Sequence, residues 1–66
     1  MSIKELLSYF QGLGVRCNLI YGEDSTQTLR LRKSGRGVSL SLYEWHNYPP
    51  HKKQECVKIL SEELGL

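Results

Sequence analysis

The sequence lacks the groupings of residues on which most enzymes depend. It contains no CxxC pair, no paired-carboxylate motif, no Ser/His/Asp or Cys/His spacing with an orienting partner, and no glycine-rich loop that opens a helix. With 66 residues there is also little room for an enclosed active site. We therefore expect a protein that is not an enzyme, with no cofactor and no metal.

Long apolar runs and clustered cysteines are also missing. No run approaches the roughly 20 residues of a membrane helix, and no signal-peptide pattern precedes the first predicted helix. This predicts a cytoplasmic protein with no membrane partner. Cys17 and Cys56 lie far apart in the sequence, which favours buried reduced thiols, with a disulfide or a metal ligand as alternatives.

The remaining composition is that of one small globular domain, spanning residues 1–66. Hydrophobic residues make up 39% and charged residues 24%, which is ordinary for a folded chain. Nine Lys and Arg against seven Asp and Glu leave a net charge of +2, a weak preference for acidic partners.

The most informative stretch runs from Leu29 to Trp45, where apolar and polar residues alternate with the period of a strand. Two strands, at about 26–33 and 37–45, are predicted around a turn in which Gly35 and Gly37 supply positive φ angles. The leucines should face the core. The opposite face should then carry Arg30, Arg32, Ser39, Ser41, Tyr43 and Trp45.

The flanking segments predict two helices and one more strand. Ser2 and Glu5 form a capping box before an apolar helical stripe that ends at the glycines of positions 12 and 14. Residues 15–21 alternate as a first strand, with Arg16 on its polar side. A second helix should begin at Pro50 or His51 and end at Gly65. We predict an α+β fold of order αβββα, with a three-stranded antiparallel sheet and both helices on one face.

Eight residues are candidates for contact with a partner because they are basic or aromatic and lie on the hairpin or at the second helix start. Three of these choices have alternatives. The aromatics could cap the core, and the arginines could form a solvated strand face. The lysine pair could bind an anion with the free amides of the helix start, or simply be exposed. The candidates are Arg30, Arg32, Lys33, Arg36, Tyr43, Trp45, Lys52 and Lys53.

Two families resemble parts of this sequence. ELLSYFQGLGV, followed by Gly22, Asp24 and LRLRKSG, resembles the TubC-type N-terminal docking domains of peptide and polyketide synthases over residues 5–35. That resemblance implies a hairpin that receives an acidic tail, although this chain continues into VSLSLYEWHNYPP where those domains enter a helix. The element order also resembles HicA-type mRNA interferases and double-stranded-RNA-binding domains, but residues 25–28 lack the HicA catalytic histidine.

Two functional hypotheses follow from these residues. The first is a non-enzymatic protein-binding module of docking, adaptor or inhibitor type, which engages an acidic partner through the basic hairpin and a sheet edge. The alternative is an RNA- or DNA-binding domain that uses the same basic residues on phosphates and the aromatics on bases. A homodimer stays open under both hypotheses.

Overall fold

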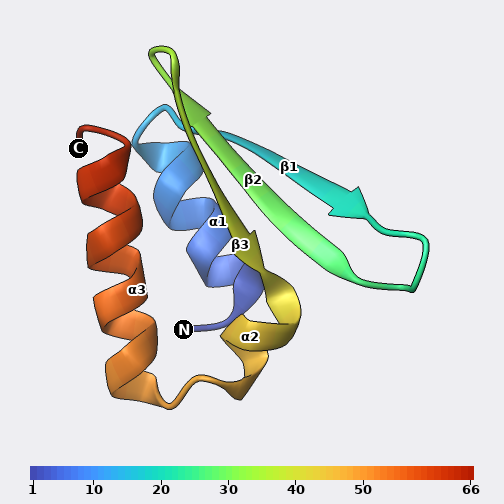
Figure 1. Ribbon diagram of the computed structural model, residues 1–66. Coiled ribbons are helices and arrows are strands. Elements are labelled where there is room, and N and C mark those ends of the chain that lie inside the picture. Colours follow the sequence, from blue (N-terminus) through green and yellow to red (C-terminus); the bar gives the residue numbers. More distant parts are fainter.

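Three antiparallel strands in the order β1-β2-β3 form the sheet of this protein, whose computed structural model describes all residues 1–66. The elements are α1 (Ile3–Gly12), β1 (Arg16–Tyr21), β2 (Gln27–Lys33), β3 (Arg36–Ser41), α2 (Leu42–Asn47) and α3 (Pro50–Glu63). The helices lie on one face of the sheet (Figure 1). The predicted α+β class and antiparallel sheet are confirmed. Each helix is too short or too polar to span a bilayer.

Helix α1 begins where the capping box predicts. The Glu5 amide donates to the Ser2 hydroxyl at 3.2 Å, and the Ser2 amide donates to the Glu5 carboxylate at 3.3 Å. These bonds satisfy amides that a helix start otherwise leaves free. One turn apart, Leu6 and Phe10 are both fully buried, so the predicted apolar stripe faces the sheet.

The β2–β3 turn consists of two residues with left-handed backbone angles. Ser34 has φ 51° and Gly35 has φ 79°, as a type I′ hairpin turn requires. Of the two glycines assigned to this turn, only Gly35 has positive φ; Gly37 lies within β3. The turn fixes the register, so that Leu29 lies opposite Leu40.

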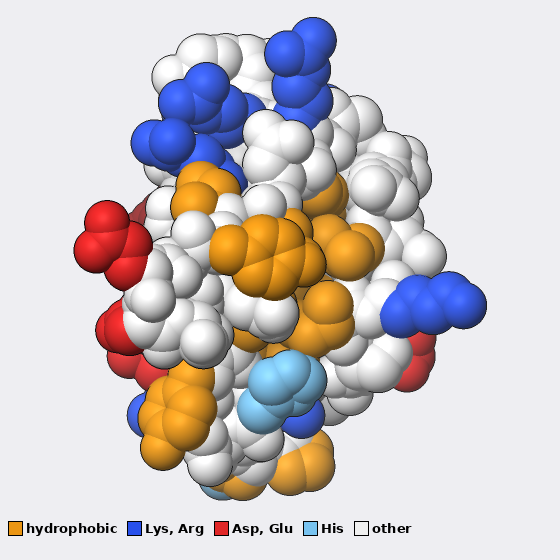
Figure 2. All heavy atoms as spheres, turned by 90° about the vertical axis from the view of Figure 1, so that its right-hand side faces the viewer, with side chains coloured by type: hydrophobic (Ala, Val, Ile, Leu, Met, Phe, Trp, Pro, Cys, Tyr) orange, Lys and Arg blue, Asp and Glu red, His pale blue; other side chains and the backbone are white.

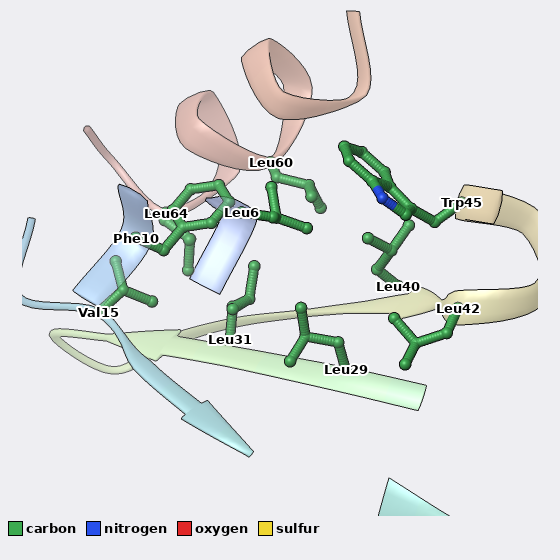
Figure 3. Packing of buried hydrophobic residues seen from close by; sticks show 10 residues of the cluster. All are labelled: Leu6, Phe10, Val15, Leu29, Leu31, Leu40, Leu42, Trp45, Leu60 and Leu64. Carbon is green, nitrogen blue, oxygen red and sulfur yellow. The ribbon is translucent and has the colours of Figure 1, made fainter. Parts of the chain in front are cut away.

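The core lies between the inner face of the sheet and the helices (Figure 3). The leucines of β2 point toward α1 and α3 (Figure 3). Arg30 and Arg32 alternate with them along the strand and are exposed, so they lie on the opposite face. Ten residues are buried: Leu6, Phe10, Val15, Leu29, Leu31, Leu40, Leu42, Trp45, Leu60 and Leu64.

The prediction that the third strand continues to residue 45 is wrong. β3 ends at Ser41, whose hydroxyl accepts a hydrogen bond from the Glu44 amide at 3.4 Å and caps α2. Leu42 and Trp45, three residues apart, then lie on one side of this short helix, and both are buried. The apolar residues Leu40 and Leu42 alternate as in a continuing strand, which is why the strand is predicted to be too long. The spacing of Ser41 and Glu44, like that of Ser2 and Glu5, is the pattern that indicates the helix start.

Trp45→Ala should lower the free energy of unfolding by about 3 to 5 kcal/mol, because it removes the largest fully buried side chain. In a domain of this size that loss should leave much of the chain unfolded at room temperature. Tyr43→Ala, on the same helix but with a side chain 75% exposed, is the matched control and should change stability by less than about 0.5 kcal/mol. Urea denaturation followed by circular dichroism compares them; equal losses would contradict the assignment of Trp45 to the core.

Candidate functional site

The helix-free face of the sheet carries three arginines in adjacent positions. Arg16 of β1 lies directly opposite Arg32 of β2, and Asn18 lies opposite Arg30. All three guanidinium side chains are on exposed residues, because no helix packs against this face. Directly opposite residues in antiparallel strands have Cβ atoms about 5 Å apart, so the charges are concentrated in a small area.

These arginines line an open hollow of about 610 Å³ at the β2–β3 turn, which we call the arginine hollow. All four arginines of the chain and one of its five lysines contribute to it, and none of the seven acidic residues does. Figure 2 shows basic side chains gathered at the end of the molecule where this turn lies. The lining residues are Gly14, Arg16, Arg30, Arg32, Lys33, Ser34, Gly35, Arg36, Gly37, Val38 and Ser39.

The small residues of β3 keep the arginine hollow open. Gly37 lies opposite Arg32 in the sheet, and Ser39 lies opposite Arg30. A Cβ built on Gly37 would be 3.7 Å from Cγ of Arg32, so the stem of this arginine lies beside the glycine. The two arginines of β2 therefore border small neighbours on the β3 side.

Lys33 and Arg36, the residues on either side of the turn, have a second role at the helix ends. The Lys33 ammonium donates to the carbonyl of Leu13, the C-cap of α1, at 2.7 Å. Arg36 lies at the end of α3, where a Cβ built on Gly65 would be 3.2 Å from Nη1. Neither helix has a basic residue in its own last turn, so the hairpin supplies the positive charge that a helix C-terminus favours.

The predicted aromatic part of the site is not assembled. Placing Trp45 on the outer face is wrong, because the residue is fully buried in the core. Tyr43 is exposed, but α2 lies at the end of the molecule far from the β2–β3 turn (Figure 1). Of the two alternatives for the aromatics, the core therefore holds for Trp45.

Lys52 and Lys53 also lie away from the arginine hollow, in the first turn of α3. The Lys52 ammonium is 4.9 Å from the centre of the Tyr48 ring, and the Lys53 ammonium is 5.6 Å from that of Trp45. Both cations thus contact aromatic faces locally. Of the eight candidates only those of the hairpin form a common surface: Arg30, Arg32, Lys33 and Arg36. Trp45 is in the core, and the other three lie away from the hairpin turn.

Both thiols are free, but the cysteines are half-buried and not fully buried as predicted. Burial raises the pKa of Cys17, and burial together with the Glu44 carboxylate raises the pKa of Cys56. Both side chains are therefore protonated at neutral pH, whereas the thiolate is the nucleophilic form. No group of three or more His, Cys, Asp or Glu side chains is arranged to hold a metal ion.

The free edge of β3 borders the arginine hollow. A two-residue hairpin turn makes Lys33 and Arg36 a hydrogen-bonded pair, after which backbone groups along β3 point alternately toward β2 and away. The amides and carbonyls of Gly37 and Ser39 therefore point outward, and no other backbone group in the protein bonds to them.

Sequence reasoning places Ser39 on the polar face but does not predict that Arg16 and Gly37 belong to the site. The signal for Arg16 was its position on the polar side of the first strand, but its neighbour Arg32 becomes visible only through the strand register. Gly37 was read as a turn residue, and no sequence pattern indicated that it borders a hollow.

Lys33→Met should lower the free energy of unfolding by about 1 kcal/mol, because it removes the charged hydrogen bond to the end of α1. Arg32→Met is the matched control. Arg32 is next to Lys33 in the sequence but lies on the helix-free face, so its replacement should change the free energy of unfolding by less than about 0.5 kcal/mol. Urea midpoints of the two variants decide the matter; equal stability would contradict a capping role for Lys33.

Comparisons with protein-family models, with curated proteins and with solved structures return no match. The resemblances to docking domains and to HicA-type toxins stay predictions. The functional assignment rests on charge, burial and the free backbone groups of the sheet.

Proposed function

We propose that this protein is a non-enzymatic protein-binding module of docking, adaptor or inhibitor type. Its ligand is an acidic, extended segment of another protein. The segment binds in the arginine hollow and along the adjoining edge of β3.

The observation that carries this proposal is that all four arginines of the chain line one open hollow whose lining contains no acidic residue, Arg16, Arg30 and Arg32 from the helix-free face and Arg36 from beside the turn. Guanidinium groups bind carboxylates through two parallel hydrogen bonds, which lysine cannot do. Four of the five lysines lie elsewhere. The side chain suited to planar anions is thus selectively placed here, and an acidic ligand would relieve the repulsion between neighbouring guanidiniums.

The edge of β3 supports an extended rather than a compact ligand. Gly37 and Ser39 offer free amides and carbonyls, to which a peptide strand can add by main-chain hydrogen bonds. Alternate side chains of an added strand would lie on the helix-free face, in the same rows as Arg30 and Arg32. A segment with acidic residues at every second position fits this arrangement.

Nucleic-acid binding receives less support from the geometry. A single strand is bound by a basic groove together with aromatic side chains on which bases stack. Here Trp45 is buried, Tyr43 lies at the opposite end of the sheet, and Lys52 and Lys53 are directed to local aromatic rings. The arginine hollow has no aromatic residue in its lining.

Replacing both arginines of β2 by glutamate should abolish binding of acidic peptides while leaving the fold intact. We expect Arg30→Glu with Arg32→Glu to weaken binding of a synthetic glutamate–valine repeat peptide by at least about tenfold, by introducing repulsion at the contact. Lys52→Glu with Lys53→Glu makes the same charge change at the other end and should leave affinity unchanged. Amide chemical shifts of Gly37 and Ser39 report the binding site.

The same titration with single-stranded and duplex RNA distinguishes the two classes of ligand. Phosphate binding should decline steeply between about 50 and 200 mM salt. RNA that binds the arginine hollow more tightly than the peptide at the higher salt would overturn the protein-binding proposal. An acidic peptide that shifts no amide of β3 at low salt would overturn the site.

A further inference from the structure

The second free edge of the sheet, on β1, differs in chemistry from the edge of β3. Leu19, Ile20 and Tyr21 follow one another and are 44%, 44% and 67% exposed, although Leu29, the direct neighbour of Leu19, is buried. Apolar side chains form the middle of the face in Figure 2, the side on which β1 lies in Figure 1. Proteins usually protect edge strands with charge, proline or a bulge, and this half of β1 has none of these.

The backbone of β1 has unpaired groups at regular intervals. The Gly22 amide donates to the Thr26 carbonyl at 2.7 Å, in the same register as the β1–β2 ladder. Counting back from Gly22, the backbone amides and carbonyls of every second residue therefore point toward β2. Those of the residues between them point away from the sheet. The outward groups belong to Cys17, Leu19 and Tyr21, and no backbone hydrogen bond elsewhere in the protein engages them.

These three residues are symmetric about Leu19, and we propose that β1 is a homodimer interface in which two copies pair their β1 strands antiparallel about a two-fold axis through Leu19. In that register Leu19 pairs with Leu19 of the second copy, and Cys17 pairs with Tyr21. All outward amides and carbonyls of both strands are then satisfied. If the second copy is shifted by two residues in either direction, one of the residues Cys17, Leu19 and Tyr21 no longer lies opposite any of these three in the second copy.

The charges at the two ends of β1 are complementary in the same register. Arg16 begins the strand, and the acidic turn residues Glu23 and Asp24 follow its end. Arg16 would lie opposite Gly22 of the second copy, one position from Glu23. The two Arg16 residues would be about 20 Å apart, six residues along the strand at ~3.3 Å each, which avoids their mutual repulsion. A hydrogen bond from the Thr26 hydroxyl lowers the pKa of Asp24, so this carboxylate is ionised at neutral pH.

The dimer is a separate proposal from the function above and is compatible with it, and the two share one residue, Arg16, which lines the arginine hollow. The added strand lies on the edge away from β3, so Arg30, Arg32 and the β3 edge of both copies stay accessible. An acidic ligand is a poorer occupant of the β1 edge, because Glu23 and Asp24 would repel it at one end. The charge order along β1 matches a second copy instead.

The pairing is tested by cross-linking at the proposed axis. In a Cys17→Ala, Cys56→Ala background, Leu19→Cys should give a covalent dimer with a short bis-maleimide in dilute solution, because the two new thiols face each other. Ile59→Cys, on α3 and 54% exposed, is the control and should stay monomeric. Circular dichroism verifies that both variants are folded. Equal cross-linking of the two thiols, or none with Leu19→Cys, would overturn the proposal.

Charge exchange tests the register without new thiols. Sedimentation of the unmodified protein should show a monomer–dimer equilibrium, and Arg16→Glu should weaken association by at least about tenfold. Adding Glu23→Arg and Asp24→Arg to that variant should restore the association. If Arg16 has only a structural role, the added substitutions should not restore it. A protein that stays monomeric at every concentration reached contradicts the homodimer, while the peptide titration of the arginine hollow is judged separately by the amide shifts of Gly37 and Ser39. Uptake of the glutamate–valine peptide at the β1 edge contradicts the homodimer and also the assignment of the peptide to the β3 edge.

Discussion

The separation of leucines from arginines along β2 is the constraint on which the rest of the structure depends. Leu29 and Leu31 are buried beneath the helices, and Arg30 and Arg32, which alternate with them, are exposed to water. A slip of one residue in the ladder would exchange the two sets and place guanidinium groups in the core, where an unpaired charge is very costly. The type I′ turn prevents that slip at one end, and the buried side chains oppose it at the other. The binding surface is thus a direct result of the alternation that forms the core.

The positive charges at this end of the sheet lie on two different faces, which the order of residues in the sequence does not show. Lys33 and Arg36 point to the helix side and lie at the C-terminal ends of α1 and α3. Arg16, Arg30 and Arg32 point to the free face. The first pair ties the turn to both long helices, so the second set is presented by a supported hairpin. Support of this kind reduces the ordering cost of binding.

Much of the fold could be predicted from the sequence, because its signals are local. The capping box at Ser2, the reversal at Gly35 and the alternation along β2 each depend on a few adjacent residues. Helix α2 is not predicted, because two apolar residues at Leu40 and Leu42 fit two arrangements. They fit a strand that continues, and they fit a strand that ends at Ser41 and is followed by a helix. That error moved Trp45 from the core to the surface.

The site was harder to predict than the fold because it depends on register. Arg16 joins Arg32 only through the pairing of β1 with β2, and the hollow beside Gly37 needs the third strand as well. Which backbone amides and carbonyls are unpaired at each edge depends on which residues of the strand bond to the neighbouring strand. The turn determines this alternation, and the composition of the sequence does not reveal it.

The helix-free face consists of side chains whose replacement should disturb folding little, since none of them belongs to the buried cluster. Natural selection can therefore exchange residues there one at a time, while the leucine layer beneath stays as it is. Recognition and foldability are carried by alternate positions of the same strands, so a lineage of this domain could change its ligands without passing through unstable intermediates.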